Sequence, residues 1–299
     1  MALSDLDIGT ADRADELAEV PRAGMTPDSG RPGWAARAAA GIGRTISAAL
    51  PPLLLIVALV GLWQWYVVAN DVRPTTLPSP GRVVTEGWRF RSLIWENTVP
   101  TLKETFIGFS LSVMIGSIFA VVIDFSKPIR RALYPVLVAS QTLPIIAIAP
   151  LMIIWFGFGL LPKIIVVVLV TFFPITIGLI DGFRSTEAEA MNLLGSMGAS
   201  RFEVFRYVRL PSALPSFFSG LRIGITYAVV GAVFAEYVGA KKGLGIFMLL
   251  QKNSFRTDLV LAAVFVTALV SVSLFALVSV IQRLTIPWYA ASRRHEQNA

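Results

Sequence analysis

Few side chains in this sequence could contact a solute or carry out chemistry, and they lie within long apolar stretches. Glu236 stands late in one stretch, and Tyr227 lies nine residues before it. Gln141 and Thr142 interrupt another stretch. Because an acidic residue near the centre of a membrane helix costs at least about 2.5 kcal/mol, we expect Glu236 to face protein or water. These four side chains could line a path for a small polar solute.

Each of these residues also has a structural interpretation. Gln141, Thr142 and Tyr227 could join helices through hydrogen bonds, which are typically worth about 0.6 to 2 kcal/mol in membranes. Glu236 lies near the expected outer end of its stretch, where water could solvate the carboxylate. We expect no acidic companion for it within the apolar stretches, which disfavours a membrane-embedded enzyme. Both interpretations remain open on residue types alone.

The sequence lacks the residues that several kinds of catalysis and ligand binding require. The chain has no cysteine, so disulfides and thiolate ligands are excluded, and its single histidine, His295, lies in a polar tail. No Gly-x-x-x-x-Gly-Lys-Ser/Thr loop is present to wrap the phosphates of a nucleotide. We therefore expect no catalytic residue, no metal site and no cofactor in this chain.

The composition is typical of a membrane protein. Hydrophobic residues make up 55% of the chain and charged residues only 15%, and the mean hydropathy is +0.68. So much apolar surface in 299 residues calls for lipid as a partner. The net charge of +7 is scattered along the chain without a basic stripe, so we expect no nucleic-acid partner.

The apolar stretches predict an all-α polytopic membrane protein with six transmembrane helices. An α-helix needs about 20 apolar residues to cross a bilayer. Six stretches approach or exceed this length, at about 51–68, 102–123, 133–158, 163–180, 218–238 and 259–284. Six crossings place both termini on one side of the membrane.

Lysine and arginine residues near the ends of the spans predict which side of the membrane holds the two termini. These residues are retained on the cytoplasmic side of membranes. One side would hold arginines before the first span, after the second and fourth spans, and at the end of the chain. The opposite side carries basic residues too, so the bias is moderate. We expect a multi-pass protein of the cell membrane with cytoplasmic N- and C-termini.

The remaining segments complete the predicted domain organisation. Residues 1–45 are acidic and rich in proline and glycine, which predicts a disordered cytoplasmic arm without a secretory signal. Residues 46–290 are predicted to form the transmembrane domain, and residues 291–299 a cytoplasmic tail. Within the domain, the loop at about 181–216 has apolar residues at helical spacing, which predicts two short helices joined near Gly198. Residues 239–257 suggest either a short external or re-entrant element or a solvated hairpin.

The loop at 181–216 carries a resemblance to a known family. Gly198 is followed at a fixed interval by Leu210 and Pro211, and Asn192-Leu193-Leu194 precede it. This arrangement resembles the cytoplasmic signature of binding-protein-dependent ABC importer permeases, in which a Glu-Ala-Ala triplet precedes the glycine and a Leu-Pro pair follows. The glutamate of the triplet is replaced here by Asn192. An ordinary amphipathic helix on the membrane surface is the alternative.

The resemblance implies a fold, partners and a set of functional residues. The fold would be that of a type I ABC importer permease, and the loop would form a coupling helix that docks on a partner ATPase, where ATP and Mg²⁺ bind. The other partners would be an extracytoplasmic substrate-binding protein and a second permease copy, identical or different. The residues that would couple to the ATPase are Asn192, Leu193, Leu194, Gly198, Ala199, Ser200, Arg201, Leu210 and Pro211.

The resemblance extends over about residues 77–288, and some motifs in it resemble one branch of the importer permease family. Phe172-Phe173-Pro174-Ile175 and Gly243-Leu244-Gly245 are similar to permeases for thiamine-precursor pyrimidines or riboflavin, within a branch that also serves nitrate, sulfonate and taurine. The expected solute is a thiamine-precursor pyrimidine or a related heterocycle, with sulfonate, taurine or nitrate as alternatives. An ATP-independent channel or secondary transporter is the rival class, and the Gly198 to Pro211 signature disfavours it.

Overall fold

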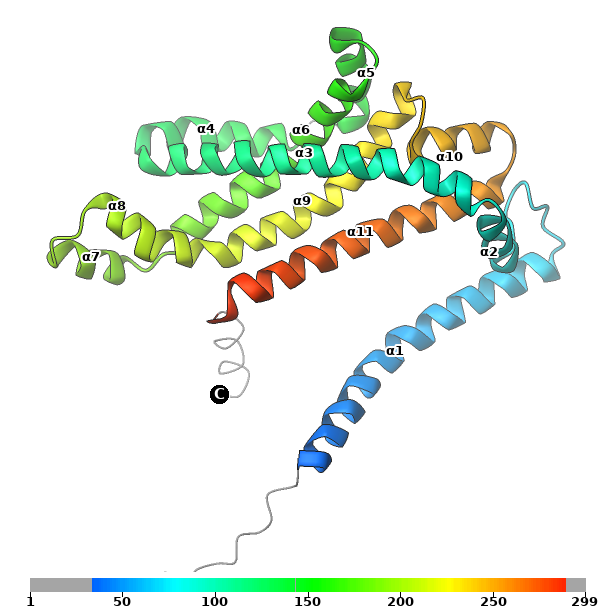
Figure 1. Ribbon diagram of the computed structural model, residues 1–299, viewed down its shortest axis with the longest axis horizontal. Coiled ribbons are helices and arrows are strands. Elements are labelled where there is room, and N and C mark those ends of the chain that lie inside the picture. Colours follow the sequence, from blue (N-terminus) through cyan, green and yellow to red (C-terminus); the bar gives the residue numbers. More distant parts are fainter. Residues whose placement is uncertain (1–33, 143, 289–299) are drawn as a thin grey trace, which may run out of the picture. The chain divides into compact units, whose positions relative to one another are not determined.

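The structure is a computed structural model that describes residues 34–142 and 144–288 (Figure 1). All regular elements among these residues are helices, which confirms the predicted all-α class. The membrane-length elements are α1 (Trp34–Ala69), α3 (Arg91–Phe125), α6 (Leu160–Arg184), α9 (Leu210–Gly239) and α11 (Thr257–Thr285). The shorter helices are α2 (Pro80–Arg89), α4 (Lys127–Ser140), α5 (Ile145–Phe156), α7 (Ala188–Ser196), α8 (Arg201–Val204) and α10 (Leu244–Asn253).

Among the described residues, five helical segments are long and apolar enough to cross a membrane, and they contain five of the six predicted spans. The predicted span at 133–158 is not one continuous helix in the structure, because its residues belong to α4 and α5, which are separated by a break after Ser140. Pro144 explains the break: proline lacks an N–H group and disfavours helical geometry in the residue before it. Gln141, at the end of α4, thereby becomes a loop side chain between two apolar helices.

The chain divides into two compact units at Val60 and Gly61. The first unit is described from Trp34 onwards and consists of the helical residues 34–60 of α1, with Pro51 and Pro52 inside the helix. The predicted arm at 1–45 therefore overlaps the start of α1, and its residues 1–33 lie outside the described part of the chain. The predicted tail at 291–299 lies outside it as well.

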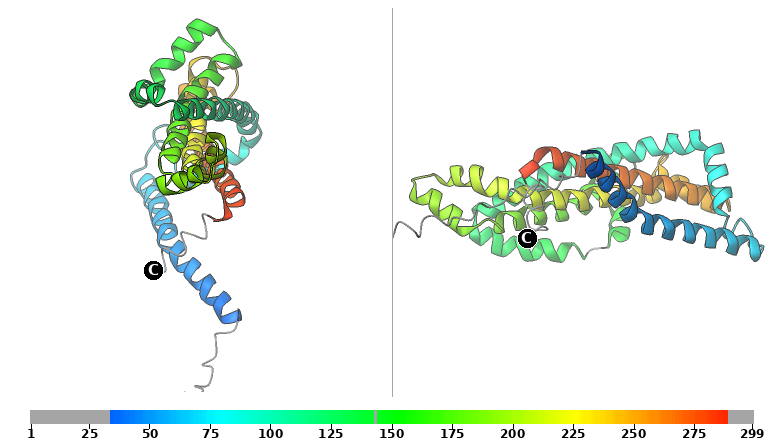
Figure 2. Two further views of the ribbon diagram at one scale, coloured as in Figure 1. Left: turned by 90° about the vertical axis from the view of Figure 1, so that its left-hand side faces the viewer. Right: turned by 90° about the horizontal axis from the view of Figure 1, so that it is seen from below.

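The core of the second unit is built from α3, α6 and α9, which lie side by side in the bundle that Figure 2 shows end-on and from below. Small residues let α6 and α9 approach closely. A Cβ added at Gly220 of α9 would lie only 2.5 Å from the carbonyl oxygen of Pro174 on α6. Gly178 of α6 lies against Gly220 in the same contact, where a Cβ added at Gly178 would lie 3.1 Å from the Cα of Gly220. Buried apolar residues from α6, α9 and α11 then close the centre, among them Val167, Ile225 and Leu274.

The short helices α2, α7, α8 and α10 lie at the two ends of this bundle, whereas α5 projects from its side (Figure 1). At one end, which we call the coupling end, α3 and α6 finish, α4 and α9 begin, and α7 and α8 project. At the other end, which we call the α10 end, α10 packs against α9 and α11, and α2 packs against α11. The sequence analysis missed α2, although its Ser79 accepts a hydrogen bond from the N–H of Arg82 and Pro80 opens the helix.

Candidate functional site

The coupling end carries an exposed segment between α6 and α9, which we call the coupling segment and define as residues 188–209. It comprises α7, α8 and a π-helical turn at Phe205–Arg209. Gly198 joins the two α-helices with a φ of +85°, a left-handed conformation in which a Cβ would be strained. The prediction of two short helices joined near Gly198 is therefore confirmed.

Side-chain capping fixes where the second of these helices begins. The N–H of Glu203 donates to the Ser200 hydroxyl over 3.3 Å, and the N–H of Ser200 donates to the Glu203 carboxylate over 2.7 Å. This reciprocal pair is a capping box, which satisfies two backbone donors at once. Ser200, selected from the sequence as a coupling residue, thus has a clear local role in shaping the segment.

The apolar side chains of the coupling segment are turned outward. Leu193, Met197 and Phe202 are 63%, 75% and 64% exposed, and neither α7 nor α8 buries any residue within the chain. Asn192, Gly198 and Arg201 are exposed on the same segment, while Leu194 and Ala199 are half-buried. An apolar patch on projecting helices is typical of a surface that binds another protein. Leu210 and Pro211 open α9 directly behind it.

An ion-pair cluster joins the coupling segment to the bundle, and the sequence analysis missed it. Asp124, buried at the end of α3, lies 2.6 Å from Nη1 of Arg209 and accepts a hydrogen bond of 2.7 Å from Nη2. Arg130 of α4 donates to the same carboxylate over 2.7 Å. One buried carboxylate therefore holds two guanidinium groups that come from different elements.

Aromatic contacts reinforce this attachment. The ring of Phe205, in the π-helical turn, lies 5.2 Å from that of Phe125 on α3 and 5.5 Å from that of Phe183 on α6. The guanidinium of Arg209 also lies over the Phe183 ring at 5.8 Å. These contacts attach the coupling segment to the ends of α3 and α6. A π-helical turn at this point is consistent with a functional site, where such turns are frequent.

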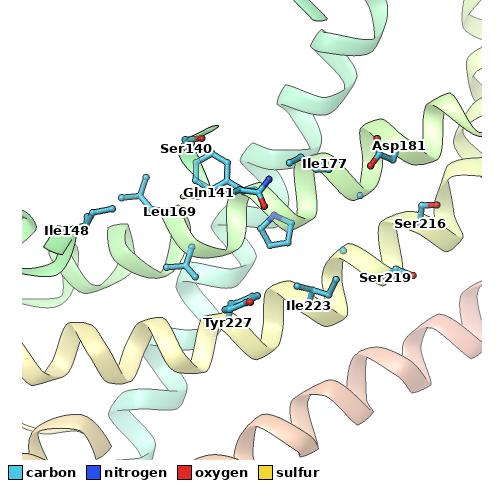
Figure 3. A pocket seen from close by; sticks show the side chains of 15 residues that line it. Ser140, Gln141, Ile148, Leu169, Ile177, Asp181, Ser216, Ser219, Ile223 and Tyr227 are labelled. Atoms are coloured by element: carbon cyan, nitrogen blue, oxygen red, sulfur yellow. The ribbon is translucent and has the colours of Figure 1, made fainter. Parts of the chain in front are cut away.

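A cavity of about 670 Å³ lies between the α4–α5 break, α6 and α9 (Figure 3). Gln141 and Tyr227, both selected from the sequence, line it from opposite sides. Within the described residues, neither side chain makes a hydrogen bond. The other lining residues are Ser140, Ile148, Leu169, Val170, Phe173, Pro174, Ile177, Gly178, Asp181, Ser216, Ser219, Gly220 and Ile223.

The other two predicted path residues lie elsewhere. Thr142 is exposed beyond the cavity lining, and its hydroxyl donates to the carbonyl of Ala139 over 2.7 Å. Glu236 is fully buried away from the cavity, where it accepts hydrogen bonds from Thr101 and from the N–H of Gly245, each over 2.6 Å. The structure therefore brings together two of the four predicted residues.

Glu236 belongs to a buried polar cluster near the α10 end. Glu104 lies one turn after Thr101 on the same buried face of α3, which makes it a neighbour of Glu236, and it forms an ion pair of 2.5 Å with Lys163 of α6. The expectation that Glu236 has no acidic companion in the apolar stretches is therefore wrong. Glu104 lies within the predicted span 102–123, and its distance of 132 residues along the chain hid the pairing.

A second ionic cluster lies at the α10 end, where it joins α2 to the first turn of α11 and to Arg256 just before it. Arg256 donates to Asp258 over 3.0 Å and to Glu86 of α2 over 2.6 Å. Arg82 of α2 also donates to Asp258, over 3.2 Å. The hydrogen bond to Asp258 and the charges of Asp258 and Glu86 raise the pKa of Arg256 above its ordinary value. This cluster ties α2 to α11 without taking part in the cavity.

These features define a class of protein: a multi-pass helical membrane component with a cavity between its helices and an exposed apolar segment at one end. The profile of the binding-protein-dependent transport system inner membrane component family matches residues 112–290. The chain belongs to this family, as its resemblance predicted. It is a permease component of an ABC transporter, and not an enzyme.

Curated relatives cover most of the chain. The formylaminopyrimidine transport permease protein ThiX of Halalkalibacterium halodurans is 37% identical over 80% of this chain and 96% of its own length. The riboflavin transport system permease protein RibX of Chloroflexus aurantiacus is 37% identical over 80% of this chain and 90% of its own length. The taurine transport system permease protein TauC of Escherichia coli is 30% identical over 78% of this chain and 88% of its own length.

A solved structure supports the fold at lower identity. An amino acid ABC transporter chain, crystallised with histidines, superposes with a TM-score of 0.53 at 16% identity, over 67% of this chain and 95% of that chain. At this identity the likeness bears on the fold alone. It agrees with the predicted architecture of a type I ABC importer permease.

Proposed function

We propose that this chain is the permease subunit of an ATP-driven importer and that its coupling segment docks on a partner ATPase that binds ATP and Mg²⁺. The observation that carries the proposal is the exposed apolar face of α7 and α8, held at a fixed geometry by Gly198 and the capping box. Leu193, Met197 and Phe202 are the side chains that would enter a groove of the partner.

The attachment of this segment suggests how ATPase closure reaches the solute path. Arg209 and Phe205 connect it to the ends of α3 and α6, and Leu210 and Pro211 continue it into α9. The cavity lies between α6 and α9. Movement of the docked segment would therefore shift the two helices that line the cavity, opening it alternately to each side of the membrane.

The proposed orientation places the coupling end in the cytoplasm, with both termini on that side. Basic residues gather there on α4, at the end of α6 and along the coupling segment, as the retention of positive charge in the cytoplasm requires. The described members are Arg130, Arg131, Arg184, Arg201, Arg206 and Arg209. The α10 end would then face the extracytoplasmic binding protein that delivers the solute.

A second permease copy, identical or different, would complete the solute path. Leu151, Ile154, Trp155 and Phe158 carry exposed apolar surface on and after α5, which is short for a membrane crossing. Lipid or a second permease would cover this surface in the membrane. Gln141 and Tyr227 would then bind the solute between the two copies.

The cavity lining favours an uncharged heterocycle as the solute. Its polar groups are an amide, a phenol, serine hydroxyls and the carboxylate of Asp181, and no lysine or arginine lines it among the described residues. A ring with hydrogen-bonding edges suits Gln141 and stacks on Tyr227, whereas an anion would lack a cationic partner. The best proposal is a thiamine-precursor pyrimidine or a related heterocycle, and sulfonate, taurine or nitrate is the alternative.

Reconstitution tests both levels of this proposal. The chain would be incorporated into proteoliposomes with the ATPase and binding protein that co-purify with it. We expect ATP-dependent uptake of radiolabelled formylaminopyrimidine that unlabelled taurine does not compete away. Uptake of taurine instead of the heterocycle would support the sulfonate alternative. Uptake by the purified chain without ATP would identify a secondary transporter or channel.

Tyr227→Ala and Gln141→Ala test the solute contacts. Each should weaken uptake of the heterocycle by about tenfold, which corresponds to the loss of one good contact of about 1.4 kcal/mol. The matched control is Thr142→Ala, next to Gln141 but outside the cavity lining. ATPase activity should remain in all three variants. Unchanged uptake by the first two would remove the cavity from the solute path.

A further inference from the structure

The cluster of Glu104, Lys163 and Glu236 is the most deeply buried group of charged side chains described in the structure. Glu104 is 2% exposed, Lys163 9% and Glu236 fully buried. They come from α3, α6 and α9, which form the core of the bundle. The transport path does not use them, since all three are absent from the cavity lining.

The hydrogen bonds of this cluster leave one atom without a donor. Oε1 of Glu104 accepts from Lys163, and the two carboxylate oxygens of Glu236 accept from Thr101 and from the N–H of Gly245. Oε2 of Glu104 is buried without a hydrogen-bond donor among the described residues. Thr101, which donates to Glu236, lies one turn before Glu104 on the same buried face of α3, so the two carboxyl groups are neighbours. Two neighbouring carboxylates in a buried site repel each other unless one of them binds a proton.

The charge balance leads to the same conclusion. The cluster contains two carboxyl groups and one ammonium group, that of Lys163, which is paired with Glu104. Two carboxylates and one ammonium would leave a net negative charge in the core of a membrane bundle. One added proton makes the cluster neutral, which is the condition that burial favours.

We propose that Glu104 and Glu236 form a buried proton-binding site, in which one proton is carried on Oε2 of Glu104 and donated to Glu236. The proton supplies the missing hydrogen-bond donor and removes the excess charge. Lys163 remains an ammonium group paired with Oε1 of Glu104. The ligand of the site is a proton taken up from water, and no covalent bond other than the O–H bond is made or broken.

The proton site also holds α10 in place. Glu236 accepts from Gly245, Thr101 accepts from the N–H of Leu244, and Asn97 accepts from the N–H of Gly243 over 3.0 Å. The approach is so close that a Cβ added at Gly245 would lie 2.8 Å from the Cβ of Glu236. Loss of the proton would place two repelling carboxylates directly beneath the start of α10, so docking of this helix depends on the proton.

Infrared spectroscopy of the full chain in lipid tests the site. A protonated carboxyl group has a carbonyl stretch that is resolved from carboxylate bands and shifts in D₂O. We expect one such band at neutral pH, with loss of the band in Glu104→Gln and also in Glu236→Gln. Either substitution leaves one carboxyl group opposite Lys163, which is balanced without a proton. Glu96→Gln, at an exposed position on α3, is the matched control and should keep the band.

The pattern across variants decides the proposal. Lys163→Met should strengthen the band, because both carboxyl groups then remain neutral. The proposal is overturned by absence of the band at neutral pH, or by a band that only one of the two glutamine variants removes. As a second measurement, hydrogen exchange of the α10 amides should accelerate at a pH at which the band disappears. Unchanged exchange there would show that α10 does not depend on the proton.

Discussion

Asp124 shows how much one buried side chain can contribute at the residue scale. Its carboxylate balances Arg130 and Arg209, which are largely but not fully buried. We expect Asp124→Asn to destabilise the protein by about 3 kcal/mol, the lower end of the cost of breaking a buried ion pair, because both guanidinium groups retain some contact with water. Thermal unfolding in detergent measures the loss.

The same substitution should also separate ATP hydrolysis from uptake. Without Asp124, Arg209 no longer links the coupling segment to α3, so we expect less solute imported per ATP hydrolysed. Glu96→Gln is the control, since Glu96 forms a distant, exposed pair with Lys242 and lies outside both the cavity lining and the coupling segment. An unchanged ratio of uptake to hydrolysis in Asp124→Asn would limit the cluster to a stabilising role.

Gly198 permits a second test at this scale. We expect Gly198→Glu to reduce ATP-dependent uptake about tenfold or more, equivalent to at least about 1.4 kcal/mol of docking free energy. The added side chain would stand in the middle of the exposed apolar face. Gly198→Asn is the control because asparagine tolerates a positive φ better than other residues. Equal uptake in the two variants would argue against docking at Gly198.

At the scale of the elements, the contact between α6 and α9 is set by glycine. We expect Gly220→Ala to destabilise the bundle by about 1 to 3 kcal/mol, because its Cβ would meet the carbonyl oxygen of Pro174 and the helices would have to separate. Gly81→Ala on α2 is the control, since a Cβ there meets no atom within 4 Å. Equal melting temperatures would show that the helices separate at little cost.

The elements differ in how well the sequence predicted them. Apolar length alone located α3, α6, α9 and α11, because burial in lipid requires it. The same criterion merged α4 and α5, since hydropathy does not register the missing N–H of Pro144. It also passed over α2, a short amphipathic helix. Gln141 and Tyr227 could be selected as polar residues in apolar stretches, but their shared cavity depends on helix packing.

Pairings between distant residues were beyond the sequence analysis for a physical reason. Glu104 and Glu236, or Asp124 and Arg209, meet only because α3, α6 and α9 pack in one particular register. One sequence gives the residue types but not that register. The sequence nevertheless indicated that such pairs exist. Burying an acidic or basic side chain inside an apolar span costs free energy, so each of these side chains is expected to have a polar or oppositely charged partner.

At the scale of the whole molecule, the orientation in the membrane can be measured directly because the chain has no cysteine. Single cysteines at Ser196, on exposed α7, and at Lys241, on the exposed turn before α10, would mark the two ends of the bundle. We expect a membrane-impermeant maleimide to label Lys241→Cys in intact cells and Ser196→Cys only after permeabilisation. This result places the coupling segment beside the cytoplasmic ATPase, where ATP is available. The reverse labelling would put the coupling segment outside the cell, where it could not receive energy from ATP, and would exclude the importer mechanism.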